Sequence, residues 1–193
     1  IESPAQESTK KAVEMARANK MLVSYDPNVR ISLWPSKETC RKTILNTLSW
    51  ADVVKINEDE LEFLTGSRDT SAAEKLREEH NVPLLIITLD SRGAYFVTKH
   101  GGKQVPGFQV ELVEATGAGD GFNSGVIAGL LPLIKGKADK REALLALEQT
   151  KLFEIIQAAN AIGAITCTKA GAIPALPHRD EIDAFMAKMA VKS

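Results

Sequence analysis

Residues 52–66 read DVVKINEDELEFLTG, and this stretch indicates the fold class. Residues 52–56 form a short, mainly apolar run with the length of a buried strand. The segment that starts at Asn57 follows at once and predicts a short helix. Gly66 would end that helix, because glycine readily takes the left-handed backbone conformation found after a helix. A strand that passes directly into a helix is the building block of α/β proteins.

Similar signals lie on both sides of this stretch. Residues 21–25 (MLVSY) and 83–89 (PLLIITL) predict two more buried strands. Helices are expected near residues 4–19, with Ser3 as the N-cap, and near residues 71–80. Ser36 predicts the start of another helix, whose apolar face carries Cys40, Ile44, Leu45 and Leu48. This alternation favours a parallel sheet covered by helices.

The pattern changes after residue 93. Residues 94–113 show short β runs around a Gly-Gly turn, which predicts an antiparallel extension of the sheet. Three helical stretches follow, at residues 120–131, 140–165 and 178–190. We therefore expect residues 1–193 to form a single α/β domain.

The composition excludes several classes of protein. The 193 residues are 44% hydrophobic and 25% charged, as in a typical globular protein, and the formal net charge is −1. This charge gives no support for nucleic-acid binding, and no run is long enough to predict a membrane span. Cys40 and Cys167 are too few for a disulfide framework, so we expect reduced thiols and a cytoplasmic location.

The segment ATGAGDGFNSG, residues 115–125, precedes an apolar helical run. A glycine turn at a helix N-terminus leaves backbone N–H groups free for an anion such as phosphate. Phe122 stands where a dinucleotide-binding fingerprint needs its third glycine, and no G-K-[ST] follows, so two common phosphate loops are excluded. Asp120 could accept a proton from a hydroxyl that attacks the phosphate, or it could simply favour the helix dipole.

Three further segments carry candidate residues. Asn57 and Glu60 have the spacing of a capping box, and an exposed Glu60 could also serve a water-bound Mg²⁺. Thr88 and Gly93 bound a turn at the end of a strand, where open α/β sheets bind ligands, although an ordinary turn would look the same. The loop DPNVR places Asn28 and Arg30 after another strand, within reach of a polar substrate.

The order of these motifs is more specific than each motif alone. D-P-N-x-R, N-E-D-E with L-T-G, T-L-x-x-x-G, T-G-A-G-D and G-A-I-P-x-L-P follow one another along the chain. This series resembles the ribokinase-like carbohydrate kinases of the PfkB group, and among them most closely the fructokinases. The resemblance implies a three-layer α/β fold with a mainly parallel sheet flanked by helices. It also implies ATP-dependent phosphorylation of a sugar hydroxyl, with fructose as the expected sugar.

The resemblance assigns roles to the catalytic segments. Asp120 matches the catalytic base, and the turn from Gly117 through Ala118 and Gly119 matches an anion hole made of backbone amides. Asn57 and Glu60 match an N-x-x-E motif that organises Mg²⁺ through water. Thr88 and Gly93 match a turn that binds the nucleotide.

Other roles also follow from the resemblance. Asn160 and the loop Thr168–Ala172, with Ala170 and Gly171, match the segment that lines the adenine pocket and a monovalent-cation site. Arg30, with Asn28 in the same loop, matches residues that reach toward the sugar. Sugar and ATP are thus the expected small-molecule partners, with neither nucleic acid nor membrane, and the full-length protein is expected to be a homodimer.

The chain departs from the family pattern in two motifs. Glu114 and Ala115 replace the usual D-T before T-G-A-G-D. The family's aspartate helps to hold the monovalent cation, so Glu114 is the candidate for a K⁺ site here. Asp90 replaces the usual glycine of the T-L-G turn, where the family contacts phosphate.

Family members are considerably longer, and their N-terminal part holds a Gly-Gly sugar signature, a sugar-binding aspartate and a β lid. We therefore interpret this chain as the C-terminal, nucleotide-binding part of such a kinase. We do not expect it to catalyse alone, and we expect its exposed strand edge to promote self-association. The alternatives are a kinase for ribose, a nucleoside, 2-keto-3-deoxygluconate or a sugar phosphate, or a nucleotide-binding module without catalysis.

Overall fold

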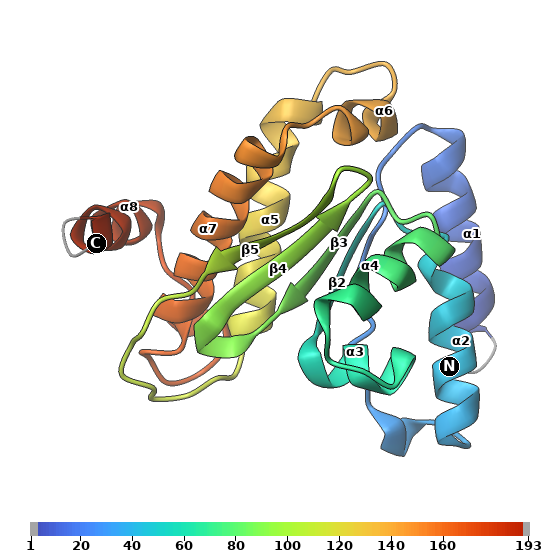
Figure 1. Ribbon diagram of the computed structural model, residues 1–193, viewed down its shortest axis with the longest axis horizontal. Helices are drawn as coiled ribbons and strands as arrows, with labels where there is room; N and C mark the ends of the chain where they lie inside the picture. The colour runs from blue at the N-terminus through green and yellow to red at the C-terminus, as the bar shows by residue number, and fades with distance from the viewer. Residues whose placement is uncertain (1–3, 191–193) are drawn as a thin grey trace. The chain divides into compact units, whose positions relative to one another are not determined.

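The computed structural model describes residues 4–190 and contains a five-stranded sheet of order β1-β2-β3-β4-β5 (Figure 1). β1, β2 and β3 pair in parallel, and residues 53–57 of β2 lie opposite residues 84–88 of β3. The parallel arrangement expected from the alternating strands and helices is confirmed. The strands are β1 (Ser24–Tyr25), β2 (Val53–Asn57), β3 (Leu84–Thr88), β4 (Gly93–Thr98) and β5 (Gly101–Pro106).

The last two strands form the antiparallel extension that the sequence predicts. Residues 89–92 join β3 to β4 and residues 99–100 join β4 to β5, and such short connections can join neighbouring strands only in antiparallel order. The expected Gly-Gly turn is displaced, however. Gly101 and Gly102 begin β5, and the turn itself is made by Lys99 and His100.

The helices follow the predicted positions with one exception. Residues 140–165 form two helices instead of one, because the backbone of Glu148 is extended and starts a new helix. The expected N-cap Ser3 lies outside the described residues. Within residues 4–190, no helix combines the length and apolarity needed to cross a membrane. The helices are α1 (Ala5–Ala18), α2 (Lys37–Leu48), α3 (Glu58–Thr65), α4 (Thr70–Glu79), α5 (Ala118–Ile134), α6 (Lys140–Leu145), α7 (Gln149–Thr166) and α8 (Arg179–Ala190).

The chain divides into two compact units, while the expectation of a single domain stays a prediction. The first unit contains the described residues up to Thr88, together with Tyr95–Gly102 and Gly136–Ala146. The second contains Leu89–Ala94, Lys103–Lys135 and the described residues from Leu147 onward. α6 belongs to the first unit and α7 to the second, so the break in the predicted helix coincides with the change of unit.

The core of the first unit is built on β2 and β3. Their apolar side chains are buried on both faces, as is usual for parallel strands covered on each side. Ser36 accepts the N–H of Thr39 at 3.0 Å and begins α2, as predicted. Helices α2, α3 and α4 add buried side chains to this core: Cys40, Ile44, Leu48, Leu61, Leu64, Ala73 and Leu76.

β1 is shorter than the run MLVSY suggested. The N–H of Val23 donates to the carboxylate Oδ2 of Asp52 at 2.8 Å instead of to a neighbouring strand. The strand pairing therefore starts only at Ser24, which lies opposite Val53.

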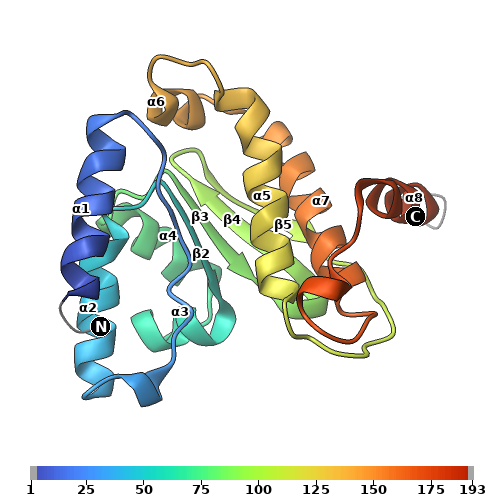
Figure 2. The ribbon, with the colours of Figure 1, turned by 180° about the vertical axis from the view of Figure 1, so that it is seen from behind.

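In the second unit, α5 and α7 lie side by side (Figures 1 and 2). Gly125 makes this close approach possible. A Cβ atom there would lie 2.9 Å from the Cα of Ala159 and 2.8 Å from the Cδ1 of Ile162 on α7. Phe122, Val126, Leu152 and Ile156 are buried around this contact.

Gly125→Val is expected to lower the free energy of unfolding by about 2 to 3 kcal/mol, because the added side chain must push α7 away. Ile127→Val on the exposed face of α5 serves as the control and should change it by less than about 0.5 kcal/mol. Urea denaturation of both variants measures the difference. Equal stability of the two variants would contradict the packing described here.

Candidate active site

Asn57 and Thr88 end two neighbouring parallel strands. They are register partners in the β2–β3 pair, so both lie at the carboxyl edge of the sheet. Ligands of open α/β folds bind at this edge. The structure thus brings together two residues that the sequence assigned to different motifs, the N-x-x-E segment and the nucleotide turn.

Glu60 closes the capping box that its spacing predicts. The Oδ1 of Asn57 accepts the N–H of Glu60 at 2.8 Å, and the Oε2 of Glu60 accepts the N–H of Asn57 at 2.9 Å. The expectation that Glu60 is exposed is wrong, since only 6% of it is accessible. Glu60 is buried because the backbone of a distant segment packs against its second carboxylate oxygen.

Glu60 also holds the DPNVR loop. Its Oε1 accepts the N–H of Val29 at 2.7 Å. Val29 lies between the predicted substrate residues Asn28, which has a left-handed backbone (φ +49°), and Arg30, which is exposed. One buried carboxylate therefore places this loop beside the helix that begins after Asn57.

Lys55 is a residue at this edge that sequence reasoning missed. It lies in β2, is only 8% exposed, and its Nζ is 3.1 Å from the Oδ2 of Asp26 in the DPNVR loop. A buried ammonium group needs such a partner. The sequence did contain a signal for this residue, because Lys55 interrupts an otherwise apolar strand.

Tyr25 in the neighbouring strand β1 is also affected by this environment. Burial, followed by the charges of Cys40, Glu60 and Asp26, raises the pKa of Tyr25 to about 12.

The glycine turn belongs to the second unit. Gly117 is the N-cap of α5 with φ +83°, a conformation that favours glycine. A Cβ atom there would also lie 2.9 Å from the Cα of Ala172. The turn therefore packs against the Thr168–Ala172 loop, which joins two segments that the sequence placed at the nucleotide.

The backbone amides that are free at this turn are not all those expected for the anion hole. The N–H of Ala118 is donated to the carbonyl of Ala115 at 3.2 Å, so it is not free for an anion hole. Within the described part of the chain, the N–H groups of Gly119 and Asp120 have no hydrogen-bond partner. The Asp120 side chain is exposed in the same helical turn. Two amides and one accessible carboxylate thus share the start of α5.

Glu114 is tied to the same loop. Its Oε2 accepts the N–H of Gly171 at 2.8 Å, and this bond, followed by that of the Thr116 hydroxyl, lowers the pKa of the Glu114 carboxyl. The N–H groups of Val113 and Glu114 donate to the carbonyl of Cys167 at 2.8 and 3.2 Å. The glutamate that replaces the family's aspartate therefore still lies at the predicted loop.

Asn160 anchors α7 to the end of β5. Its Nδ2 donates to the carbonyls of Val105 and Pro106 at 3.3 and 3.1 Å, and the residue is 8% exposed. Its amide hydrogens are thus engaged by backbone, which leaves the side-chain carbonyl for a ligand. Thr168 donates its hydroxyl to Ile165, and Ala170 is exposed.

The turn between β3 and β4 depends on Gly93. Its φ is +97°, and a Cβ atom there would lie 2.1 Å from the carbonyl oxygen of Val105. Asp90, at the position where the family has glycine, also has a left-handed backbone with φ +51°. Aspartate tolerates this conformation better than most residues, so the turn keeps a glycine-like backbone despite the substitution.

Among residues 4–190, no group of three or more His, Cys, Asp or Glu side chains could hold a metal ion. A Mg²⁺ ion bound mainly by phosphate and water needs no such group, because this ion keeps several waters and takes few protein ligands. A Mg²⁺ ion carried by a nucleotide therefore stays a prediction.

A family model described as pfkB family carbohydrate kinase matches residues 3–179. The chain belongs to this family. It is 40% identical over 187 residues to probable fructokinase-4 of Arabidopsis thaliana, an alignment that covers 96% of the chain and 55% of the relative. The chain thus spans about half the length of the curated relatives it matches.

Solved structures agree with the family. A fructokinase double mutant from Vibrio cholerae O395, bound to fructose, ADP and potassium, matches 95% of the chain with a TM-score of 0.80 and 31% identity. A fructokinase from Xylella fastidiosa with bound ATP matches 98% of it with a TM-score of 0.87 and 26% identity. The chain covers 56% and 59% of these proteins. The expected ribokinase-like α/β fold is confirmed.

Glu60→Gln is expected to lower the free energy of unfolding by about 2 kcal/mol, because an amide NH₂ would then face a backbone N–H donor. Glu62→Gln, the same change in an exposed ion pair with Arg68, should have an effect close to zero. Chemical denaturation followed by circular dichroism compares the two variants. Similar losses in both would contradict the buried role of Glu60.

Glu114→Gln tests whether the Glu114 carboxylate stabilises the fold through its bond to Gly171, and the measurement is the dependence of stability on pH. Because the pKa of Glu114 is lowered in the fold, its carboxylate stabilises the protein above the ordinary pKa. This contribution disappears as the pH falls through the lowered value. The wild type should therefore melt above the variant at pH 7, and the gap should begin to narrow near the ordinary glutamate pKa of about 4.3 and close at lower pH. Glu111→Gln, an exposed control, should show no such gap, and a gap independent of pH would refute the assignment.

Proposed function

We propose that the chain is the nucleotide-binding part of an ATP-dependent sugar kinase that phosphorylates fructose. The observation that carries the proposal is the start of α5, where the amides of Gly119 and Asp120 are free and the Asp120 carboxylate is accessible. Free amides at a helix N-terminus attract phosphate. Membership of the pfkB family and the similarity to fructokinases support the choice of reaction and sugar.

Asp120 acts as the general base in this proposal. A carboxylate beside a phosphate site weakens simple anion binding, so its presence favours a role in proton transfer. It removes the proton from the sugar hydroxyl while that hydroxyl attacks the terminal phosphate. The amides of Gly119 and Asp120 stabilise the negative charge that develops on the phosphoryl oxygens.

Bound ATP would supply the transferable phosphoryl group, and a Mg²⁺ ion would neutralise its charge. Asn57 organises the metal's water at the carboxyl edge of β2, and Glu60 holds Asn57 and the DPNVR loop in place from its buried position. Asn28 and Arg30 in this loop face the sugar. Thr88 and the turn that ends at Gly93 bind the nucleotide, together with Asn160 and the Thr168–Ala172 loop.

Glu114 provides the anionic side of a monovalent-cation site next to this loop. Its carboxylate keeps a lowered pKa and a bond to Gly171, so it is ionised at neutral pH. Potassium in the Vibrio cholerae fructokinase structure supports a cation of this type.

In the longer kinase of which we propose this chain to be a part, Asp120→Asn is expected to lower fructose-dependent ADP release by about 10²- to 10⁴-fold while ATP·Mg²⁺ binding is kept. Asp180→Asn is a matched control, since Asp180 is also an exposed aspartate in the first turn of a helix. Coupled-enzyme assays measure turnover and calorimetry measures nucleotide binding for the three proteins.

Turnover that survives Asp120→Asn would rule out the proposed base. A chain that binds neither ATP nor ADP would contradict the nucleotide site itself. If the 193-residue chain alone binds the nucleotide without turnover, this result would agree with the proposal that it is only the nucleotide-binding part. The chain spans about half the length of its relatives.

A further inference from the structure

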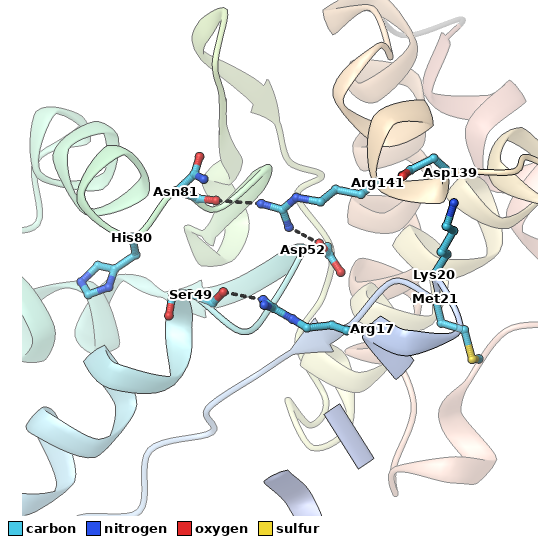
Figure 3. Close-up of a pocket in the computed structure, with 9 residues that line it drawn as sticks. All are labelled: Arg17, Lys20, Met21, Ser49, Asp52, His80, Asn81, Asp139 and Arg141. Carbon is cyan, nitrogen blue, oxygen red and sulfur yellow. Dashed lines mark hydrogen bonds and ion pairs between the residues drawn. The ribbon is translucent and has the colours of Figure 1, made fainter. Parts of the chain in front are cut away.

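A polar pocket lies at the amino ends of β2 and β3, opposite the ends that carry Asn57 and Thr88. Its volume is about 380 Å³, and all its lining residues belong to the first unit (Figure 3). Asp52 directly precedes β2, whereas Asn57 ends it. Five strand residues separate the two sites by about 17 Å. The pocket is therefore separate from the N-x-x-E segment.

Three cationic side chains line this pocket. The Nη2 of Arg17 donates to the carbonyl of Ser49 at 2.7 Å, and Arg141 donates to the Asp52 carboxylate and to the carbonyl of Asn81. Figure 3 shows both guanidinium groups reaching into the pocket beside Asp52. Each guanidinium has five N–H donors, so these bonds leave several donors on each arginine for a ligand.

The two acidic side chains of the pocket are already engaged. Asp52 is 5% exposed, and its two oxygens accept the N–H of Val23 and a guanidinium N–H of Arg141. The Oδ1 of Asp139 accepts the N–H of Glu142 at 3.0 Å and caps α6. The remaining cation is Lys20, whose side-chain ammonium has no hydrogen bond or ion pair to any residue in the described range 4–190, while its backbone N–H donates to the carbonyl of Arg17.

The backbone of Lys20 strengthens the case for a role of its side chain. Lys20 follows the C-cap residue Asn19 of α1 and has φ +52°, a position where glycine is usual. A lysine in this conformation is less stable than a glycine would be. A strained residue whose charged side chain lines a pocket and has no protein partner is a candidate for ligand binding.

We propose that this pocket binds a phosphate group of a small metabolite. Lys20 supplies the unpaired charge, and the spare N–H groups of Arg17 and Arg141 supply the directional bonds that suit phosphate oxygens. The volume is near the lower end of small-molecule pockets, which suits pyrophosphate or one sugar phosphate. This site is independent of the proposed kinase chemistry.

The location is tested by ¹H–¹⁵N correlation spectra of the chain titrated with pyrophosphate, with glucose 6-phosphate, and with glucose as the uncharged control. The two phosphate compounds should shift the amides of Lys20, Met21, Ser49 and Asn81, and glucose should not. Whichever of these two compounds binds with the higher affinity shows whether the pocket prefers a pyrophosphate or a sugar phosphate. Shifts confined to residues 117–121, or equal shifts with glucose, would overturn the proposal.

The residue is tested by Lys20→Gly, which removes the cation and suits the left-handed backbone. The variant should melt no lower than the wild type and bind the tighter phosphate compound at least tenfold more weakly by calorimetry. Lys11→Ala, a change of an exposed lysine on α1, is the control and should bind normally. Arg141 is left intact, because its removal would leave the buried Asp52 without its cation. Unchanged affinity in Lys20→Gly would refute the site.

Discussion

The buried carboxylate of Glu60 is the interaction on which the candidate site in the first unit depends. It accepts the N–H of Asn57 with one oxygen and the N–H of Val29 with the other. A carboxylate that accepts two backbone bonds is held rigidly, and so are the donors. The end of β2, the start of α3 and the DPNVR loop are thereby joined through one side chain. The capping box is formed by the same two residues, Asn57 and Glu60, to which we assign the proposed magnesium motif.

The second unit uses the same principle with a different carboxylate. Glu114 accepts the N–H of Gly171, while Gly117 allows the turn before α5 to contact Ala172. A side chain at Gly117 would separate the turn from that loop. The start of α5 keeps two amides without partners inside the described chain, as is usual for the first turn of a helix. Gly117 therefore lets the turn pack against the loop and leads into the helix start that carries these free amides.

The first unit also shows how the two ends of a strand can serve different purposes. The carboxyl ends of β2 and β3 carry Asn57 and Thr88, while the amino ends lie beside Arg17, Asp52 and Arg141. Helices α2 and α4 end near the amino edge, and the carbonyls of Ser49 and Asn81 just after them accept hydrogen bonds from Arg17 and Arg141. These bonds explain why two arginines gather there. They do not explain Lys20, whose charge they leave without a partner.

The sequence alone determined the α/β class and most element positions, because periodicity, caps and glycine turns are local signals, and the order of its motifs carried the resemblance to the family. Ser36, Asn57, Gly66 and Gly117 act on their own neighbours in the chain, so their effects could be predicted. Only the tertiary structure decided that Glu60 is buried, that Lys55 pairs with Asp26, and that the predicted helix after Lys140 breaks in two. It alone assembled the pocket around Asp52, whose partner Arg141 is 89 positions away in the chain. Such contacts depend on how distant segments pack, and no local pattern of residue types records that.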